Sequence, residues 1–244
     1  MVSSAALAVL WAFALAAVAP ASAHDLVTAE SVQAYLATQE KLQKITASPE
    51  PAEARAKAWL ELGILLDGIR DLLNRDLEAH GRVQGLSSNF LMSELRLRGS
   101  GLAYSTDTNR FIANLQYYRE ALRLAPSGEV AAAASFRLLQ GYFYDSFSDD
   151  PLQPAAQSQA QLAEQIRLGE DLLKKVPRHA EREEALFILV VHYVQAARTA
   201  ERGSGRAAFA QKARVTAGEF AKTYPESLRT AALPHLLEGL PAGR

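Results

Sequence analysis

Apolar residues recur every three or four positions along most of the chain beyond residue 28, and this spacing places them on one face of an α-helix. Short clusters of proline, glycine, serine and aspartate interrupt the pattern, and these residues favour turns. The pattern predicts a series of helices at residues 28–47, 51–80, 90–97, 109–125, 129–147, 155–176, 180–201, 204–224 and 226–238.

One nearly continuous apolar segment, residues 186–193, is the single candidate for a β-strand. It lies inside a longer helical pattern, so a helix that is buried on several sides explains it more simply. No stretch shows the alternation and β-branched composition of a long strand. Helices without strands to pair predict an all-α fold, an array of antiparallel helix pairs.

The N-terminal segment has the pattern of a secretory signal peptide. Residues 5–19 are continuously apolar, and Pro20 and the small residues Ala21, Ser22 and Ala23 follow them. This predicts a signal peptide at residues 1–23 that is cleaved after Ala23, which makes the mature protein exported and, for a chain without cysteine, periplasmic. The run is short for a membrane span, so no stable insertion is expected after cleavage, although a retained N-terminal anchor is the alternative.

Charge and composition narrow the class of protein further. The 244 residues include 26 Lys plus Arg and 27 Asp plus Glu, without a block of one sign, which disfavours a nucleic-acid partner. The absence of cysteine excludes disulfides, thiolate catalysis and cysteine-ligated zinc. Packing and hydrogen bonds must therefore stabilise the fold.

Residues 117–126 carry an aromatic pair, then Ala121, Leu122 and finally Pro126, and this segment resembles the second helix of a tetratricopeptide repeat. Trp59 and Gly63 lie in a segment, residues 59–66, that resembles the first helix of such a repeat, and residues 172–177 and 220–227 are weaker echoes. The resemblance implies an α-solenoid of about eight or nine helices. It divides the chain into an N-terminal helical region at 24–107 and a repeat region at 108–244.

Two groups of residues are candidates for binding. Cleavage after Ala23 would give His24 a free α-amine beside its imidazole, a pair that can chelate copper if folding supplies another imidazole such as His80. Tyr142, Tyr144 and Phe147 lie in one short aromatic run. Because successive helical positions cannot all face the core, at least one of these aromatics is expected on a partner-binding surface.

Other polar residues have simpler explanations. His192 lies among apolar residues and is expected to be a buried histidine with a hydrogen bond to a neighbour. Asp145, Asp149 and Asp150 lack the spacing of a calcium loop and are expected at a solvated helix end. The serines have no nucleophile motif around them, so the sequence predicts no enzyme and no cofactor.

The sequence thus predicts a periplasmic helical-repeat scaffold or adaptor that binds another protein or peptide of the cell envelope on a concave surface. A periplasmic metal or small-ligand binding protein that uses His24 is the alternative. A helical enzyme, such as a cell-wall hydrolase, is a third hypothesis and requires a catalytic glutamate in a deep cleft.

Overall fold

The computed structural model describes residues 29–80, 93–94, 102–105, 109–145, 159–176, 181–200 and 204–241; the side chains of residues 29, 80, 142–145, 159 and 204 are outside this description. Eight long helices and two short strands make up the described part. The helices are α2 (Ala29–Thr46), α3 (Ala52–His80), α5 (Gln116–Leu124), α6 (Gly128–Asp145), α7 (Gln159–Lys175), α8 (Arg182–Thr199), α9 (Ser204–Thr223) and α10 (Leu228–Leu237).

The predicted all-α class is confirmed, and most helices begin and end within a few residues of the predicted bounds. The apolar segment 186–193 is the middle of helix α8, which is buried along most of its length. As expected, residues that favour turns lie between the elements. Ser227 caps α10 by accepting a hydrogen bond from the backbone N–H of Arg229 (3.2 Å).

The helix predicted at 109–125 is wrong in its first part. Strands β1 (Leu102–Ser105) and β2 (Arg110–Ala113) form an antiparallel hairpin there, and α5 starts only at Gln116. The strand is fixed by a residue far away in sequence, because Asn74 of α3 donates to the carbonyl of Phe111 (3.0 Å) and accepts from its N–H (2.7 Å). The short helix predicted at 90–97 lies outside the described residues except at 93–94, which are helical.

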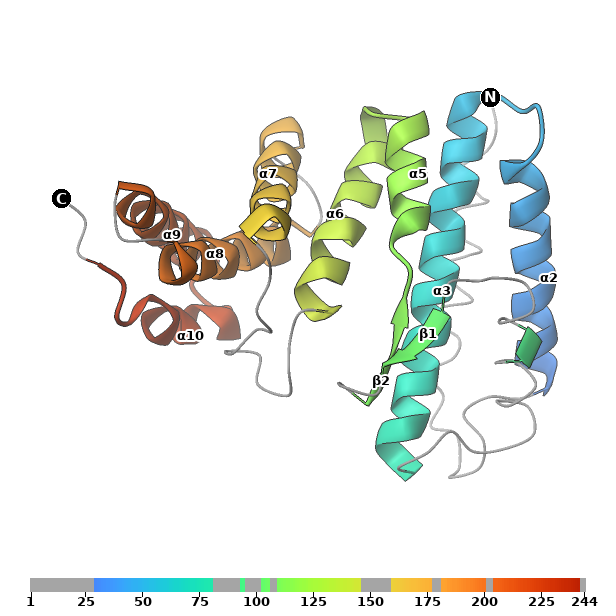
Figure 1. Cartoon of the computed structure of the whole chain (residues 1–244), viewed down its shortest axis with the longest axis horizontal. Helices are drawn as coiled ribbons and strands as arrows, with labels where there is room; N and C mark the ends of the chain where they lie inside the picture. The colour runs from blue at the N-terminus through green and yellow to red at the C-terminus, as the bar shows by residue number, and fades with distance from the viewer. Residues whose placement is uncertain are drawn as a thin grey trace.

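The helices follow one another across the molecule in chain order, from α2 at one end to α9 and α10 at the other (Figure 1). Each one packs against the next, and three pairs of second neighbours are also in contact, namely α3 with α6, α6 with α8 and α8 with α10. We call α3, α6, α8 and α10 the linked helices. No helix in the part of the chain that the structure describes is long and apolar enough to cross a membrane.

The buried apolar residues form three adjoining clusters. One joins α2, α3, β2 and the start of α5; a second lies among α3, α5, α6 and α7; the third and largest joins α6 to α10. Since every cluster shares a helix with the next, the core continues from one end of the described structure to the other.

Candidate functional site

The binding residues predicted from the sequence receive no structural support. His24 and Phe147 lie outside the described residues, and Tyr142 and Tyr144 lie on α6 with their side chains outside the description. His192 is 1% exposed, and its Nδ1 lies 3.3 Å from the side-chain oxygen of Gln195. Burial lowers the pKa of His192 to about 4, so this histidine is neutral at physiological pH. Among the residues described, no group of three or more His, Asp or Glu side chains could hold a metal ion.

The two segments with the clearest repeat-like sequences pack against each other. A Cβ atom at Gly63 of α3 would lie 2.5 Å from the ring of Tyr118 of α5, so the ring occupies the space that a larger residue would fill. Beside it, the rings of Trp59 and Tyr117 have centroids 5.6 Å apart. Helices α3 and α5, which are far apart in the sequence, are thus packed closely together.

A polar cluster lies beside this contact. The hydroxyl of Tyr118 donates to Asp67 Oδ2, and Arg70 Nη1 lies 2.8 Å from Asp67 Oδ1. Arg70 also lies 2.9 Å from Asp71. Burial raises the pKa of Asp67, although Arg70, the Tyr118 hydrogen bond and nearby Arg137 partly offset it; burial and Asp67 raise the pKa of Tyr118.

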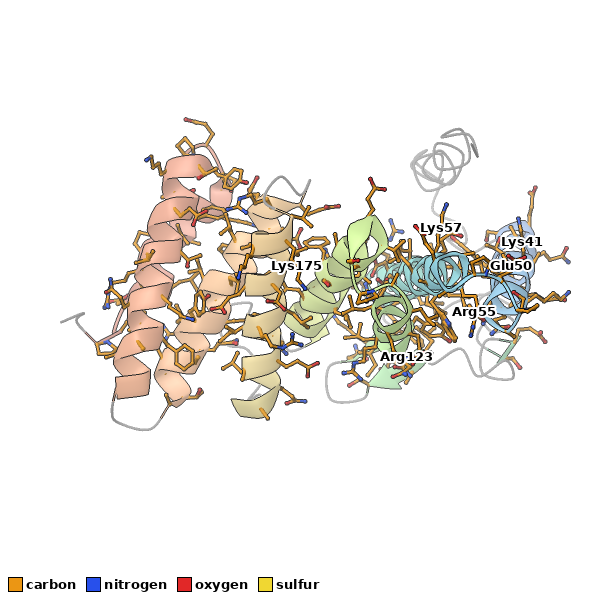
Figure 2. All side chains as sticks on the ribbon, turned by 90° about the horizontal axis from the view of Figure 1, so that it is seen from above. Lys41, Glu50, Arg55, Lys57, Arg123 and Lys175 are labelled. Atoms are coloured by element: carbon orange, nitrogen blue, oxygen red, sulfur yellow. The ribbon has the colours of Figure 1, made fainter. Side chains whose placement is uncertain are left out.

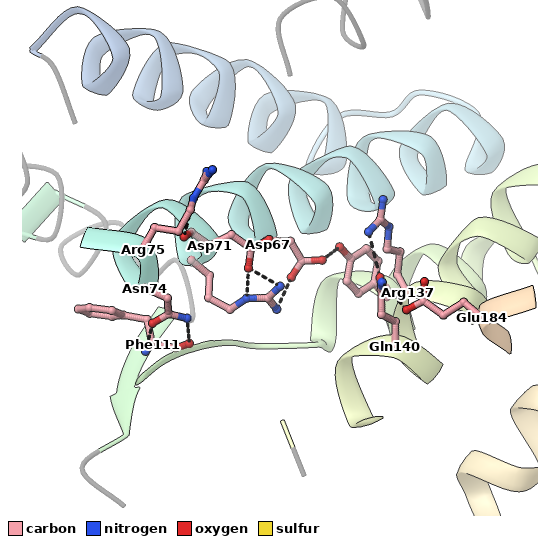
Figure 3. A network of polar contacts seen from close by, with 10 residues as sticks. Asp67, Asp71, Asn74, Arg75, Phe111, Arg137, Gln140 and Glu184 are labelled. Atoms are coloured by element: carbon pink, nitrogen blue, oxygen red, sulfur yellow. Dashed lines mark hydrogen bonds and ion pairs between the residues drawn. The ribbon is translucent and has the colours of Figure 1, made fainter. Parts of the chain in front are cut away.

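Further polar contacts join α6 to α8 (Figure 3). On α6, Arg137 Nη1 donates to Gln140 Oε1 (3.0 Å), and Gln140 Nε2 donates to Glu184 Oε1 on α8 (3.0 Å). Arg229 of α10 lies 3.8 Å from the other oxygen of Glu184, and its guanidinium covers the ring of Phe187 at 5.4 Å. We call the following six side chains the polar ladder: Asp67, Arg70, Arg137, Gln140, Glu184 and Arg229.

Exposed apolar groups accompany the linked helices. Ile64 of α3 is 41% exposed, and a Cβ at Gly68, one turn further, would meet no atom within 4 Å. At the far end, Leu228 of α10 is 93% exposed.

A groove of about 320 Å³ lies between α2 and α3. Figure 2 shows two of its lining residues, Glu50 and Lys57, where the two helices meet. Burial raises the pKa of Glu61, although Lys57, 3.9 Å away, and Lys41 partly offset it. The groove is lined by Ile45, Glu50, Ala54, Lys57, Ala58 and Glu61.

Sequence reasoning missed the polar ladder, because its members come from four helices and each one occupies an ordinary polar position. One local signal was present. Arg137 and Gln140 form an i,i+3 polar pair in the middle of helix α6, which is otherwise mostly alanine and large apolar residues. Such a pair on a mostly buried helix indicates where that helix meets polar partners.

Comparison with protein-family models, with curated proteins and with solved structures finds no significant match to this chain.

Proposed function

We propose that this chain is an exported, periplasmic helical-repeat scaffold or adaptor that binds another protein through the surface of its linked helices. The observation that carries the proposal is the alternation of contacts: every second helix, α3, α6, α8 and α10, contacts the next member of the same series. Stacked helix pairs produce this alternation, because the first helices of successive pairs line one side of the stack.

In this proposal, α3 and α5 form the first pair, α6 and α7 the second, and α8 and α9 the third, with α10 closing the stack. The close contact between Gly63 and Tyr118 supports the first pairing, since it joins the two segments that resemble the first and second helices of a tetratricopeptide repeat. Residues 81–115, which include the hairpin, are then an insertion between the two helices of one repeat.

The polar ladder supports the choice of surface. Its side chains come from all four linked helices and are held in place by hydrogen bonds and ion pairs, which reduces the entropy lost when a partner binds. The surface is long, with Ile64 near one end and Leu228 near the other. An extended peptide or a helix of another protein fits such a surface better than a compact small molecule.

Site-specific photo-crosslinking in the source cell tests the proposal. A photoreactive residue at Ile64 is expected to crosslink to a discrete partner protein. The matched control is Val215 of α9, which is 60% exposed and lies on a helix outside the linked series. Equal crosslinking at the two positions, or none at Ile64, would contradict binding through the linked helices.

The predicted export is tested separately. Mass spectrometry of the protein recovered from the periplasmic fraction is expected to find a chain that begins at His24. Recovery of the intact N-terminus from the cytoplasm would contradict this part of the proposal and leave the binding surface untouched.

A further inference from the structure

The three arginines of the polar ladder differ in their partners. Arg70 is paired with two aspartates of its own helix, and Arg229 lies near glutamates of α8. Arg137 donates one hydrogen bond, to Gln140 Oε1 (Figure 3), and none of the ion pairs among the described residues includes it. Among the three arginines of the polar ladder, Arg137 is therefore the one without a carboxylate partner in the described part of the chain.

The neighbouring carboxylates already have other partners. Asp67 accepts a hydrogen bond from Tyr118 and is paired with Arg70. The charge of Arg137 acts on Asp67 electrostatically, without a direct hydrogen bond or ion pair. Glu184 accepts from Gln140. A guanidinium has five N–H donors, of which Arg137 uses one in a direct hydrogen bond.

The Arg137 guanidinium is oriented by its neighbours, and the residue is half-buried. Gln140, which accepts from Arg137, is itself fixed by its hydrogen bond to Glu184 on the neighbouring helix (3.0 Å). No nitrogen of Arg137 is among the described buried atoms that lack a hydrogen-bond partner, so none of its unused donors is fully buried. An oriented guanidinium with open donors is suited to bidentate binding of a planar anion.

We infer that Arg137 binds a carboxylate side chain of the partner polypeptide, so that the partner segment carries an aspartate or glutamate close to an apolar residue that packs on Ile64. This inference rests on the proposed function and names the partner's chemistry. A carboxylate matches the arginine fork and brings one negative charge, whereas a phosphate would bring nearly two close to Asp67 and Glu184. The open space above Gly68 leaves room for the partner's backbone.

Selection from a library of short random peptides, with the mature chain as bait, tests the inference. Wild-type protein is expected to enrich peptides with an acidic residue at a fixed distance from an aliphatic one. The Arg137→Gln variant is expected to lose the acidic preference. The matched control is Arg123→Gln on α5, an exposed arginine that is paired with Glu120 (2.8 Å) and lies outside the linked helices, and it should keep the preference.

Affinities of one selected peptide make the test quantitative. Arg137→Gln is expected to weaken binding about tenfold, and changing the peptide's acid to its amide should weaken binding to wild-type protein about as much. The two changes together should cost little more than either alone, because they remove the same interaction. Circular dichroism checks that the variant is folded, and the peptide-side change needs no protein variant.

The possible failures are distinguishable. Selected peptides without a conserved acid, or losses of affinity that add, would overturn the role of Arg137 while leaving a peptide-binding scaffold. Enrichment of no peptide at all would count against the proposed function and, with it, against this inference.

Discussion

The α3–α5 pair and the α8–α9 pair are assembled by different means. In the first, the ring of Tyr118 fills the space at Gly63, and its hydroxyl donates a hydrogen bond to the partly buried Asp67. In the second, Phe220 and the small apolar residues of α9 pack on α8, and the polar contact between Arg182 and Glu219 (2.7 Å) lies toward the surface. The first contact combines a close fit with a directional hydrogen bond, whereas the core of the second is apolar.

The connections explain this difference. Helices α8 and α9 are joined by a few residues, so the chain itself holds them side by side and apolar stripes are enough to align them. Helix α5 meets α3 only after residues 81–115, so the connection does little to align the two helices. The close contact at Gly63 and the hydrogen bond between Tyr118 and Asp67 favour one arrangement of α3 and α5, because a shift of either helix would break both.

The largest effect is expected from Phe220→Ala. Phe220 is fully buried, with the rings of Phe187 and Tyr224 at 6.0 and 5.3 Å, so truncation should cost about 3–5 kcal/mol of unfolding free energy. Hydrogen exchange should show that the loss of protection concentrates in α8–α10. Equal loss in α2 and α3 would mean that the two regions unfold as one unit.

The next effect is expected from Gly63→Ala. The new methyl group must displace the ring of Tyr118, which is anchored by Asp67, so the variant should lose about 1–3 kcal/mol of stability, measured by chemical denaturation. Gly68→Ala, one turn along the same helix, meets no atom and should stabilise the protein by about 0.4–1 kcal/mol. Similar effects of the two changes would refute the close contact at Gly63.

The smallest effect concerns the pH dependence of stability, which should have opposite signs in the two regions. Burial raises the pKa of Asp67 above 3.8, so the folded state binds its proton more tightly and stability falls as the pH rises through this window. Burial alone would raise the pKa of Glu170, but hydrogen bonds from Lys212 and Tyr193 outweigh it and hold this pKa below 4.5. The contribution of Glu170 is present above pH 4.5 and is lost as the pH falls.

Urea unfolding of wild type, Asp67→Asn and Glu170→Gln over a pH series checks these signs. As the pH rises, the stability of wild type relative to Asp67→Asn should decrease, and its stability relative to Glu170→Gln should increase. Parallel curves for both variants would mean that the two carboxylates do not differ in the way that the structure indicates.

The helices themselves were determined by the local sequence. The period of apolar residues and the proline and glycine breaks gave bounds close to those observed for α2, α3 and α6 to α10, because a helix forms its hydrogen bonds within one segment. Even the nearly continuous apolar segment 186–193 was identified as helix from its flanking residues. These features depend on residues a few positions apart.

Tertiary structure alone decided the features that join distant segments. Strand β2 follows a helix-like apolar pattern, yet Asn74 and β1 supply its hydrogen bonds, and four residues are too few to show a strand period. The pairing of α3 with α5 and the order of the polar ladder likewise depend on which faces meet. Apolar spacing specifies that a face is buried but not which helix buries it, so these contacts arise only when the whole chain packs.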